Sequence, residues 1–309
     1  MPNVHNYLEY INAHAQPGTS GEFVLQCEQK YQNKLKNVAE KVNAKKGHQI
    51  ILLAGPSSAG KTTTAKLIKQ ELEKFNREVF TISLDDYYKN SEDAILDEDG
   101  NPDFETIYAL DLDLLSENLN GLVNNGAAEK PLFDFLTGKR QTKTERIEID
   151  DDDIVVVEGL HALNPLVTSQ LTSDNITKIF VNISSRIYNE ENKIILNKRN
   201  IRFVRRMIRD FNFRNSSVEN TLNMWRRVTL GEEKYLFPYQ DTADIKINSL
   251  HLYEPCVFRD RAIELLGHVD ASHEDFEYCR RLAKAMGKFE SIDPSQIPQT
   301  SLLREFIGY

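Results

Sequence analysis

A glycine-rich segment near residue 55 constrains this chain more than any other feature. The apolar run Ile50–Ala54 leads into Gly55, Pro56, Ser57, Ser58, Ala59, Gly60, Lys61 and Thr62, and an amphipathic stretch follows. This spacing satisfies G-x-x-x-x-G-K-[ST], the phosphate-binding loop or P-loop, in the strand–loop–helix context that the motif requires. An ordinary glycine and serine turn is the alternative, but spacing and context together favour the P-loop.

Each part of the P-loop has a chemical task. The two glycines let backbone N–H groups converge on one point, and the helix that begins near Lys61 adds its positive N-terminal end. Lys61 is expected to reach the β- and γ-phosphates, and the Thr62 hydroxyl to ligate Mg²⁺. We count Thr63 with the loop as a nucleotide-binding residue. The segment therefore predicts a nucleoside triphosphate bound with Mg²⁺.

Composition argues against several classes of protein. The chain has 309 residues and a formal net charge of −9, which argues against a nucleic-acid-binding surface. No apolar run approaches the length of a membrane span, and the first residues do not resemble a signal peptide. Cys27, Cys256 and Cys279 fit neither a metal site nor a disulfide framework. We therefore expect three reduced cysteines in a cytoplasmic protein with no nucleic-acid or membrane partner.

Apolar, β-branched runs alternate with amphipathic helices around the P-loop. The strands are expected at residues 49–54, 78–84, 154–157, 178–183 and 243–247. Such alternation predicts the α/β class, with a parallel sheet covered by helices on both faces, in the P-loop NTPase fold. We expect helical extensions over residues 1–47, including a helix at Phe23–Val42, and over residues 269–309. The P-loop domain between them is expected to span residues 48–268.

Two acidic residues directly follow predicted strands. Asp85 comes after strand 78–84 and Glu158 after strand 154–157, so both are expected in the crevice at the carboxyl ends of the strands. Asp85 can accept the proton of an attacking hydroxyl, and Glu158 can hold a water bound to Mg²⁺. A turn cap and a plain strand-end carboxylate are the respective alternatives. His161 could touch a substrate, although a lone histidine is more often structural.

Residues 200–211 form a predicted helix with an arginine-rich face. Arg202, Arg205, Arg206 and Arg209 share this face, and Arg214 lies beyond it. A row of arginines is normally a solvated surface. Beside a P-loop it also suits a lid that clamps phosphates during transfer, and the P-loop favours this second interpretation.

Taken together, these segments resemble the phosphoribulokinase/uridine kinase family of P-loop kinases over about residues 49–266. The resemblance rests on Gly55–Thr62, Ile82–Tyr88, Phe133–Arg140, Val156–His161 and Arg205–Asp210. It is closest to the bacterial uridine kinase-like group. Residues 1–47 are too short for the region similar to threonyl-tRNA synthetase that this group often carries.

The resemblance implies ATP-dependent phosphorylation of the 5′-hydroxyl of a nucleoside. It places the general base at Asp85, counts Tyr88 with the substrate residues and suggests that Asp103 reaches the ribose hydroxyls. It also puts Phe133 near the base and the arginines of residues 202–214, Arg206 and Arg209 among them, in the lid. Phe133 stands where the family typically has tyrosine, and Gly138 where it has a base-reading histidine. Selectivity for pyrimidines therefore does not follow from the resemblance.

Other functions stay open at this point. The acceptor could be another small hydroxyl compound, such as a sugar phosphate or a pantothenate-like molecule. An ATP-binding regulator that signals by conformation is an alternative from another class, and it would need no base on the substrate side. The sequence also leaves open whether the chain forms a homo-oligomer.

Overall fold

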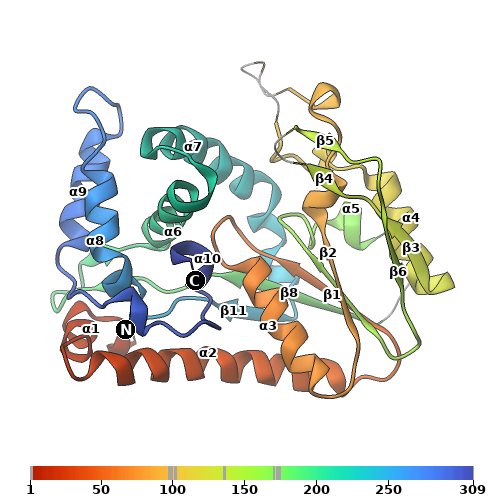
Figure 1. The fold of residues 1–309 in the computed structure, drawn as a ribbon, viewed down its shortest axis with the longest axis horizontal. Helices are drawn as coiled ribbons and strands as arrows, with labels where there is room; N and C mark the ends of the chain where they lie inside the picture. The colour runs from red at the N-terminus through yellow and green to blue at the C-terminus, as the bar shows by residue number, and fades with distance from the viewer. Residues whose placement is uncertain are drawn as a thin grey trace.

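The centre of the molecule is a five-stranded parallel sheet (Figure 1). The structure is a computed structural model, and it describes residues 3–96, 100, 103–134, 137–169, 171 and 175–308. The strands follow the order β11-β8-β1-β7-β2, and every pair is parallel. They are β1 (Gln49–Ala54), β2 (Val79–Ser83), β7 (Ile154–Glu158), β8 (Ile176–Asn182) and β11 (Ile245–Asn248). The predicted α/β class is confirmed.

Strand register brings the carboxyl ends of three strands to one edge. Glu158 at the end of β7 pairs with Leu53 of β1 on one side and with Ser83 of β2 on the other. Every residue of β1 and β7 is buried, as expected for parallel strands covered on both faces. The segments that follow β1, β2 and β7 must therefore lie together above this edge.

Helices cover both faces of the sheet, because alternate residues of β1 point into two separate apolar clusters. Ile51 and Leu53 pack in the cluster that includes α2 and α3, whereas Ile50 and Leu52 pack in the cluster that includes α4. The α-helices are α1 (Leu8–His14), α2 (Ser20–Asn43), α3 (Lys61–Glu73), α4 (Leu112–Asn125), α5 (Pro165–Thr168), α6 (Lys198–Arg214), α7 (Val218–Tyr235), α8 (Glu254–Leu266), α9 (Phe276–Met286) and α10 (Arg304–Ile307).

Short elements fill the connections. Three two-stranded antiparallel sheets pair β3 (Ala127–Lys130) with β6 (Glu145–Glu148), β4 (Phe133–Asp134) with β5 (Lys139–Arg140), and β9 (Ile187–Tyr188) with β10 (Ile194–Leu196). The 3₁₀ turns are η1 (Val4–Asn6), η2 (Leu84–Tyr87), η3 (Ser91–Asp93), η4 (Ile107–Ala109), η5 (Phe237–Thr242) and η6 (Pro294–Gln296). None of the described helices is long and apolar enough to cross a membrane. The three cysteines are free thiols.

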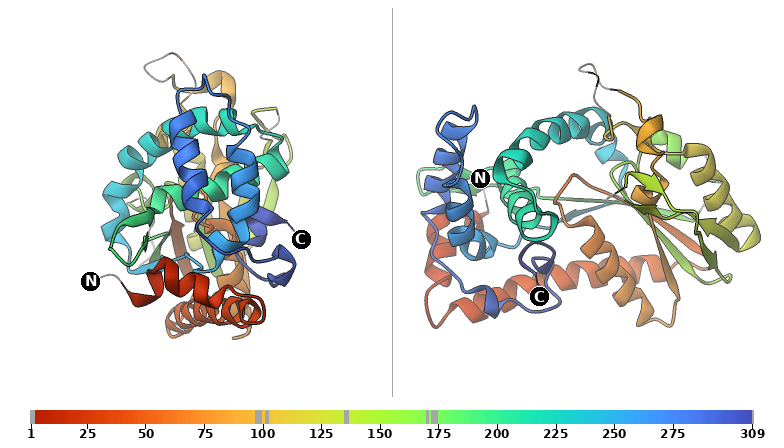
Figure 2. Two further views of the ribbon diagram at one scale, coloured as in Figure 1. Left: turned by 90° about the vertical axis from the view of Figure 1, so that its left-hand side faces the viewer. Right: turned by 45° about the horizontal axis from the view of Figure 1, so that its top comes forward.

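The two ends of the chain pack on the same side of the sheet as α3. The predicted helix at Phe23–Val42 is present within α2, and its buried face contacts α3. The C-terminal segment 297–308 lies between α2 and α6 (Figure 2), where Leu302, Leu303 and Phe306 are fully buried. A single apolar cluster thus contains residues from Leu8 to Phe306, so both ends belong to the core.

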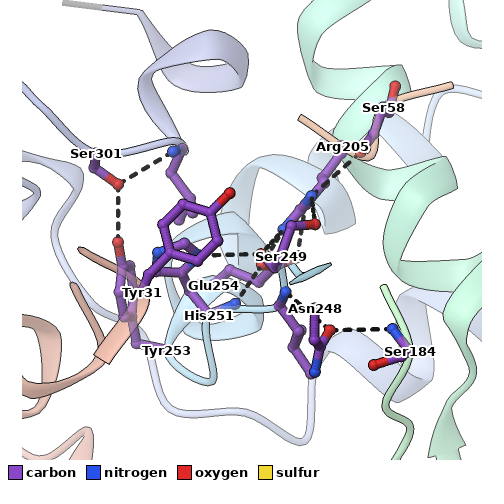
Figure 3. A network of polar contacts seen from close by, with 12 residues as sticks. Tyr31, Ser58, Ser184, Arg205, Asn248, Ser249, His251, Tyr253, Glu254 and Ser301 are labelled. Carbon is purple, nitrogen blue, oxygen red and sulfur yellow. Dashed lines mark hydrogen bonds and ion pairs between the residues drawn. The ribbon is translucent and has the colours of Figure 1, made fainter. Parts of the chain in front are cut away.

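A buried polar network ties these parts together (Figure 3). Arg205 on α6 is fully buried and donates two hydrogen bonds to Glu254 on α8, from Nε to Oε1 at 2.9 Å and from Nη2 to Oε2 at 2.6 Å. The same guanidinium donates to the carbonyl oxygen of Ser58 at 3.2 Å. On the side of α2, Ser301 donates to Glu28 at 2.6 Å and Tyr253 donates to the same oxygen. Each buried charge therefore has a hydrogen-bonded partner.

We predict that Glu254→Ala lowers the free energy of unfolding by about 3–5 kcal/mol, because it leaves the Arg205 guanidinium buried without its counter-charge. Urea denaturation measures this change. Glu264→Ala is the matched control, because Glu264 forms an exposed ion pair with Arg261 that should contribute no more than about 0.5 kcal/mol. Equal effects of the two substitutions would contradict the importance of the buried pair.

Candidate active site

The P-loop connects β1 to α3, and its two glycines are required by close contacts. A Cβ atom on Gly55 would lie 2.1 Å from the carbonyl oxygen of Val181. Gly60 has φ +83°, and a Cβ there would lie 2.5 Å from Leu302 Cδ1. No other residue type fits either position without displacing backbone or core. The loop is thus fixed by β8 on one side and by the C-terminal segment on the other.

A cavity of about 360 Å³ opens beside the P-loop, and Lys61 and Asp85 both line it. Its walls come from the P-loop and α3, from the ends of β2 and β7, from α6 and from the C-terminal helix. The lining residues are Ser57, Ser58, Gly60, Lys61, Thr62, Thr63, Asp85, Tyr88, Glu105, Glu158, Leu160, Arg206, Arg209, Arg214 and Glu305. The structure therefore brings most of the predicted site residues to one place.

Three oxygen-bearing side chains meet where β2, β7 and the start of α3 come together, and two of them, Thr62 and Glu158, line the cavity. The Thr62 hydroxyl donates to Glu158 Oε1 at 3.3 Å, and the Ser83 hydroxyl donates to the same oxygen at 3.1 Å. Burial raises the pKa of Glu158, while nearby Lys61 lowers it. Among the described residues, no group of three or more histidine, cysteine or acidic side chains could hold a metal ion. Mg²⁺ needs fewer protein ligands, because it keeps waters and binds phosphates, so one hydroxyl and one carboxylate fit it.

Asp85 lies in η2, immediately after β2. Its backbone N–H donates to the Ser83 hydroxyl at 3.3 Å, which fixes the start of this turn. The side chain is open to the cavity, yet the surrounding protein partly desolvates the carboxylate and raises its pKa, which Lys61 opposes. The neighbouring Asp86 accepts from Lys130 at 3.2 Å and from the Phe133 N–H at 3.4 Å. Asp86 therefore holds local structure, and Asp85 is the residue available to a ligand.

The arginine-rich face of α6 is not a solvated surface. Arg206 lines the cavity and donates to the Ser57 hydroxyl at 2.8 Å, and Arg209 lines it while pairing with Asp210 at 2.8 Å. Arg202 differs from the expectation: it is 3% exposed, and its two terminal nitrogens donate to Glu232 at 2.7 and 2.8 Å. Glu232 also accepts the Ser57 N–H at 2.7 Å. Arg202 therefore lies behind the P-loop, where Glu232 of α7 is its ion-pair partner.

The other predicted substrate residues lie around Tyr88. Its hydroxyl donates to the Phe104 carbonyl at 3.0 Å, and its ring centroid is 5.8 Å from that of Phe133. Neither Phe133 nor Asp103 is among the described cavity-lining residues, and Asp103 accepts the Glu105 N–H at 3.0 Å. The adjacent Asn101–Pro102 and Phe135–Leu136 lie outside the described residues.

His161 is 2% exposed and does not line the cavity. Burial lowers the pKa of its imidazole to about 4, so the ring is neutral at neutral pH. Its ring centroid lies 6.1 Å from that of Tyr235 in an edge-on contact. This placement supports the structural alternative more than contact with a substrate.

Glu105 is a cavity residue that sequence reasoning missed. Burial and the nearby Glu232 carboxylate raise its pKa to about 7, although Arg206 and Lys61 oppose the rise. Glu305, which lines the cavity, and Glu232, which lies behind the P-loop, were also missed. Arg214, which the family resemblance places in the lid with the other arginines, lines the cavity from the end of α6. No sequence signal identified the three glutamates, because they lie in segments that are distant from the P-loop along the chain.

Comparison with known proteins gives consistent matches. A family model described as the phosphoribulokinase/uridine kinase family matches residues 50–254. A uridine kinase of Staphylococcus aureus (strain JH9) is 30% identical over 203 residues, which are 65% of this chain and 88% of that protein. A solved structure described as a candidate fructose transport system kinase from Silicibacter sp. TM1040 covers 69% of this chain and 98% of its own, with a TM-score of 0.52 at 14% identity. That last likeness bears on the fold alone.

We predict that inorganic tripolyphosphate binds the cavity less tightly as the pH rises through about 7, because the Glu105 carboxyl then gains a negative charge. The ligand also titrates, so the measured quantity is the difference between the wild type and Glu105→Gln in calorimetry. The two should agree below about pH 6, where Glu105 is neutral. Above pH 8 the variant should bind about tenfold more tightly. A difference that does not depend on pH would contradict this prediction.

Proposed function

The chain belongs to the phosphoribulokinase/uridine kinase family and is a phosphotransferase, and from this premise we propose that it transfers the γ-phosphate of ATP to the 5′-hydroxyl of a nucleoside. The observation that carries the proposal is that Lys61 and Asp85 line the same cavity. A phosphate donor and a hydroxyl acceptor can then meet between a cation and a carboxylate.

The donor half of the site is the P-loop with the first turn of α3. Lys61 would contact the β- and γ-phosphates, and the N-terminal end of α3 would add its partial positive charge. Thr62 and Glu158 are the residues that would hold Mg²⁺, directly or through water. The ion would supply charge that neutralises the phosphate oxygens as transfer proceeds.

Asp85 is the proposed general base. The acceptor oxygen attacks the γ-phosphorus in line, its proton passes to the Asp85 carboxylate, and the bond to the β,γ-bridging oxygen breaks to release ADP. A raised pKa makes this carboxylate a stronger base than an exposed one. Lys61, Arg206 and Arg209 would stabilise the negative charge on the transferring group.

The acceptor is proposed to be a nucleoside because of the aromatic side chains beside Asp85. The Tyr88 ring packs edge-on against the Phe104 ring, with 6.0 Å between the ring centroids, and it lies close to Phe133. Together these rings offer an apolar surface to a nucleobase or a sugar ring. The name of the Staphylococcus aureus relative, uridine kinase, points the same way. A different small hydroxyl acceptor is the alternative, since Phe133 and Gly138 lack the polar groups that read a pyrimidine.

We expect uridine, or another nucleoside, to stimulate ADP release from Mg·ATP well above the rate with water alone. The screen compares the four ribonucleosides with fructose, glycerate, pantothenate and a pentose phosphate. Stimulation by a compound of the second group alone would replace the nucleoside with that acceptor. A slow rate that no acceptor changes would favour an ATP-binding regulator.

We predict that Asp85→Asn lowers kcat by about 10²–10⁴-fold, because the amide cannot accept the proton. Its Kd for Mg·ATP should stay within about threefold of the wild type, as calorimetry without acceptor can measure. Asp113→Asn, at an exposed position in the first turn of α4, is the control and should change neither value. Full turnover in Asp85→Asn would remove this residue from the mechanism.

A further inference from the structure

The C-terminal segment forms part of the wall of the proposed donor site, although it lies outside the residues that match the family. Leu302 packs against Gly60, and the Phe306 ring lies 5.2 Å from the Arg205 guanidinium carbon. The Phe306 carbonyl accepts from Asn212 of α6 at 3.1 Å. These contacts hold the segment against the back of the P-loop.

Glu305 projects from this segment into the cavity. Its Oε2 accepts a hydrogen bond from the Thr63 hydroxyl at 2.6 Å, and the side chain is only partly buried. This bond fixes the direction of the carboxylate and leaves Oε1 for a ligand. Glu305 therefore places a negative charge beside a loop whose ligands are negatively charged phosphates.

The arrangement of the strands indicates which end of the donor lies near Glu305. Asp85 follows β2 and Glu158 is the last residue of β7, both on one side of β1, and the Thr62 hydroxyl donates to Glu158. The C-terminal segment is tied instead to Tyr253 and Arg205, which belong to the side of β11 and α8. The γ-phosphate must approach Asp85, so the nucleoside end of the donor extends in the opposite direction, past Thr63 and Glu305.

Charge restricts what Glu305 can contact there. A carboxylate and a phosphate repel one another, whereas the neutral hydroxyl groups of a ribose donate hydrogen bonds to a carboxylate. Carboxylates bind ribose hydroxyls in this way in dinucleotide-binding folds. We propose that Glu305 binds a ribose hydroxyl of the donor nucleotide, an inference that rests on the proposed function. Thr63 acts as the positioning residue that aims the carboxylate.

The test measures equilibrium binding by calorimetry, without acceptor, on the full chain. The probes are Mg·ATP, the 2′-deoxy and 3′-deoxy analogues of ATP, and inorganic tripolyphosphate, which has no ribose. The proteins are the wild type, Glu305→Ala, Glu305→Gln and a control, Glu277→Ala, which alters an exposed carboxylate on α9. Glu305→Gln keeps an oxygen acceptor but removes the charge, and it preserves the size of the side chain.

In the wild type and in Glu277→Ala, at least one deoxy analogue should bind about tenfold more weakly than Mg·ATP. Glu305→Ala should bind Mg·ATP about tenfold more weakly and lose this discrimination, while its affinity for tripolyphosphate does not fall. Glu305→Gln should keep most of the discrimination.

Three results would overturn the inference. Equal wild-type affinity for ATP and both deoxy analogues would show that no hydroxyl is bound. Tighter binding of every probe by both Glu305 variants would show that the carboxylate only repels phosphate. Absence of Mg·ATP binding with all proteins would overturn the proposed function as well, so the two failures are distinguishable.

Discussion

Two buried arginine–glutamate pairs behind the P-loop determine how the loop can act. A loop that presents N–H groups to a phosphate turns carbonyl oxygens the other way, and a buried carbonyl needs a donor. Arg202 donates to the Ser57 carbonyl at 3.1 Å and Arg205 to the Ser58 carbonyl at 3.2 Å. Glu232 and Glu254 neutralise these arginines, so the charges can remain buried. Glu232 also accepts a hydrogen bond from the Ser57 N–H, so this N–H cannot point at a phosphate. The proposed phosphate contacts must therefore come from later in the loop.

The cavity balances charges of opposite sign. Its lining contains the cations of Lys61, Arg206, Arg209 and Arg214 and the carboxylates of Asp85, Glu105, Glu158 and Glu305. Burial raises the pKa of Glu105 and Glu158, while it lowers the pKa of Arg206. A polyanionic ligand would favour the charged arginine and the neutral carboxyl, so binding and protonation are coupled in this site. A cavity lined only by lysine and arginine would bind phosphate more tightly, but it would contain no carboxylate to accept the proton of an acceptor hydroxyl.

Short sequence patterns predicted the P-loop, the sheet and the positions of Asp85 and Glu158 at strand ends. The P-loop motif and the end of each predicted strand can be recognised within a few consecutive residues. The roles within the arginine row do not follow, because Arg202 and Arg206 are one turn apart on the same helix. Arg202 is buried only because α7 brings Glu232 against it. Glu305 lies 242 residues from Thr63 along the chain, so no pattern near either residue reveals their contact.

The anchoring of the C-terminal segment also connects the cavity to the rest of the core. The core around α3 includes Leu302 and Phe306, and Ser301 completes the hydrogen bonds of Glu28 on α2. Detachment of these residues would uncover Gly60 and remove Glu305 from the wall of the cavity. It would also take one hydrogen-bond donor away from the buried Glu28 carboxylate. Local opening of the C-terminal segment would therefore change the shape of the cavity and the stability of α2 together, so these two properties are coupled.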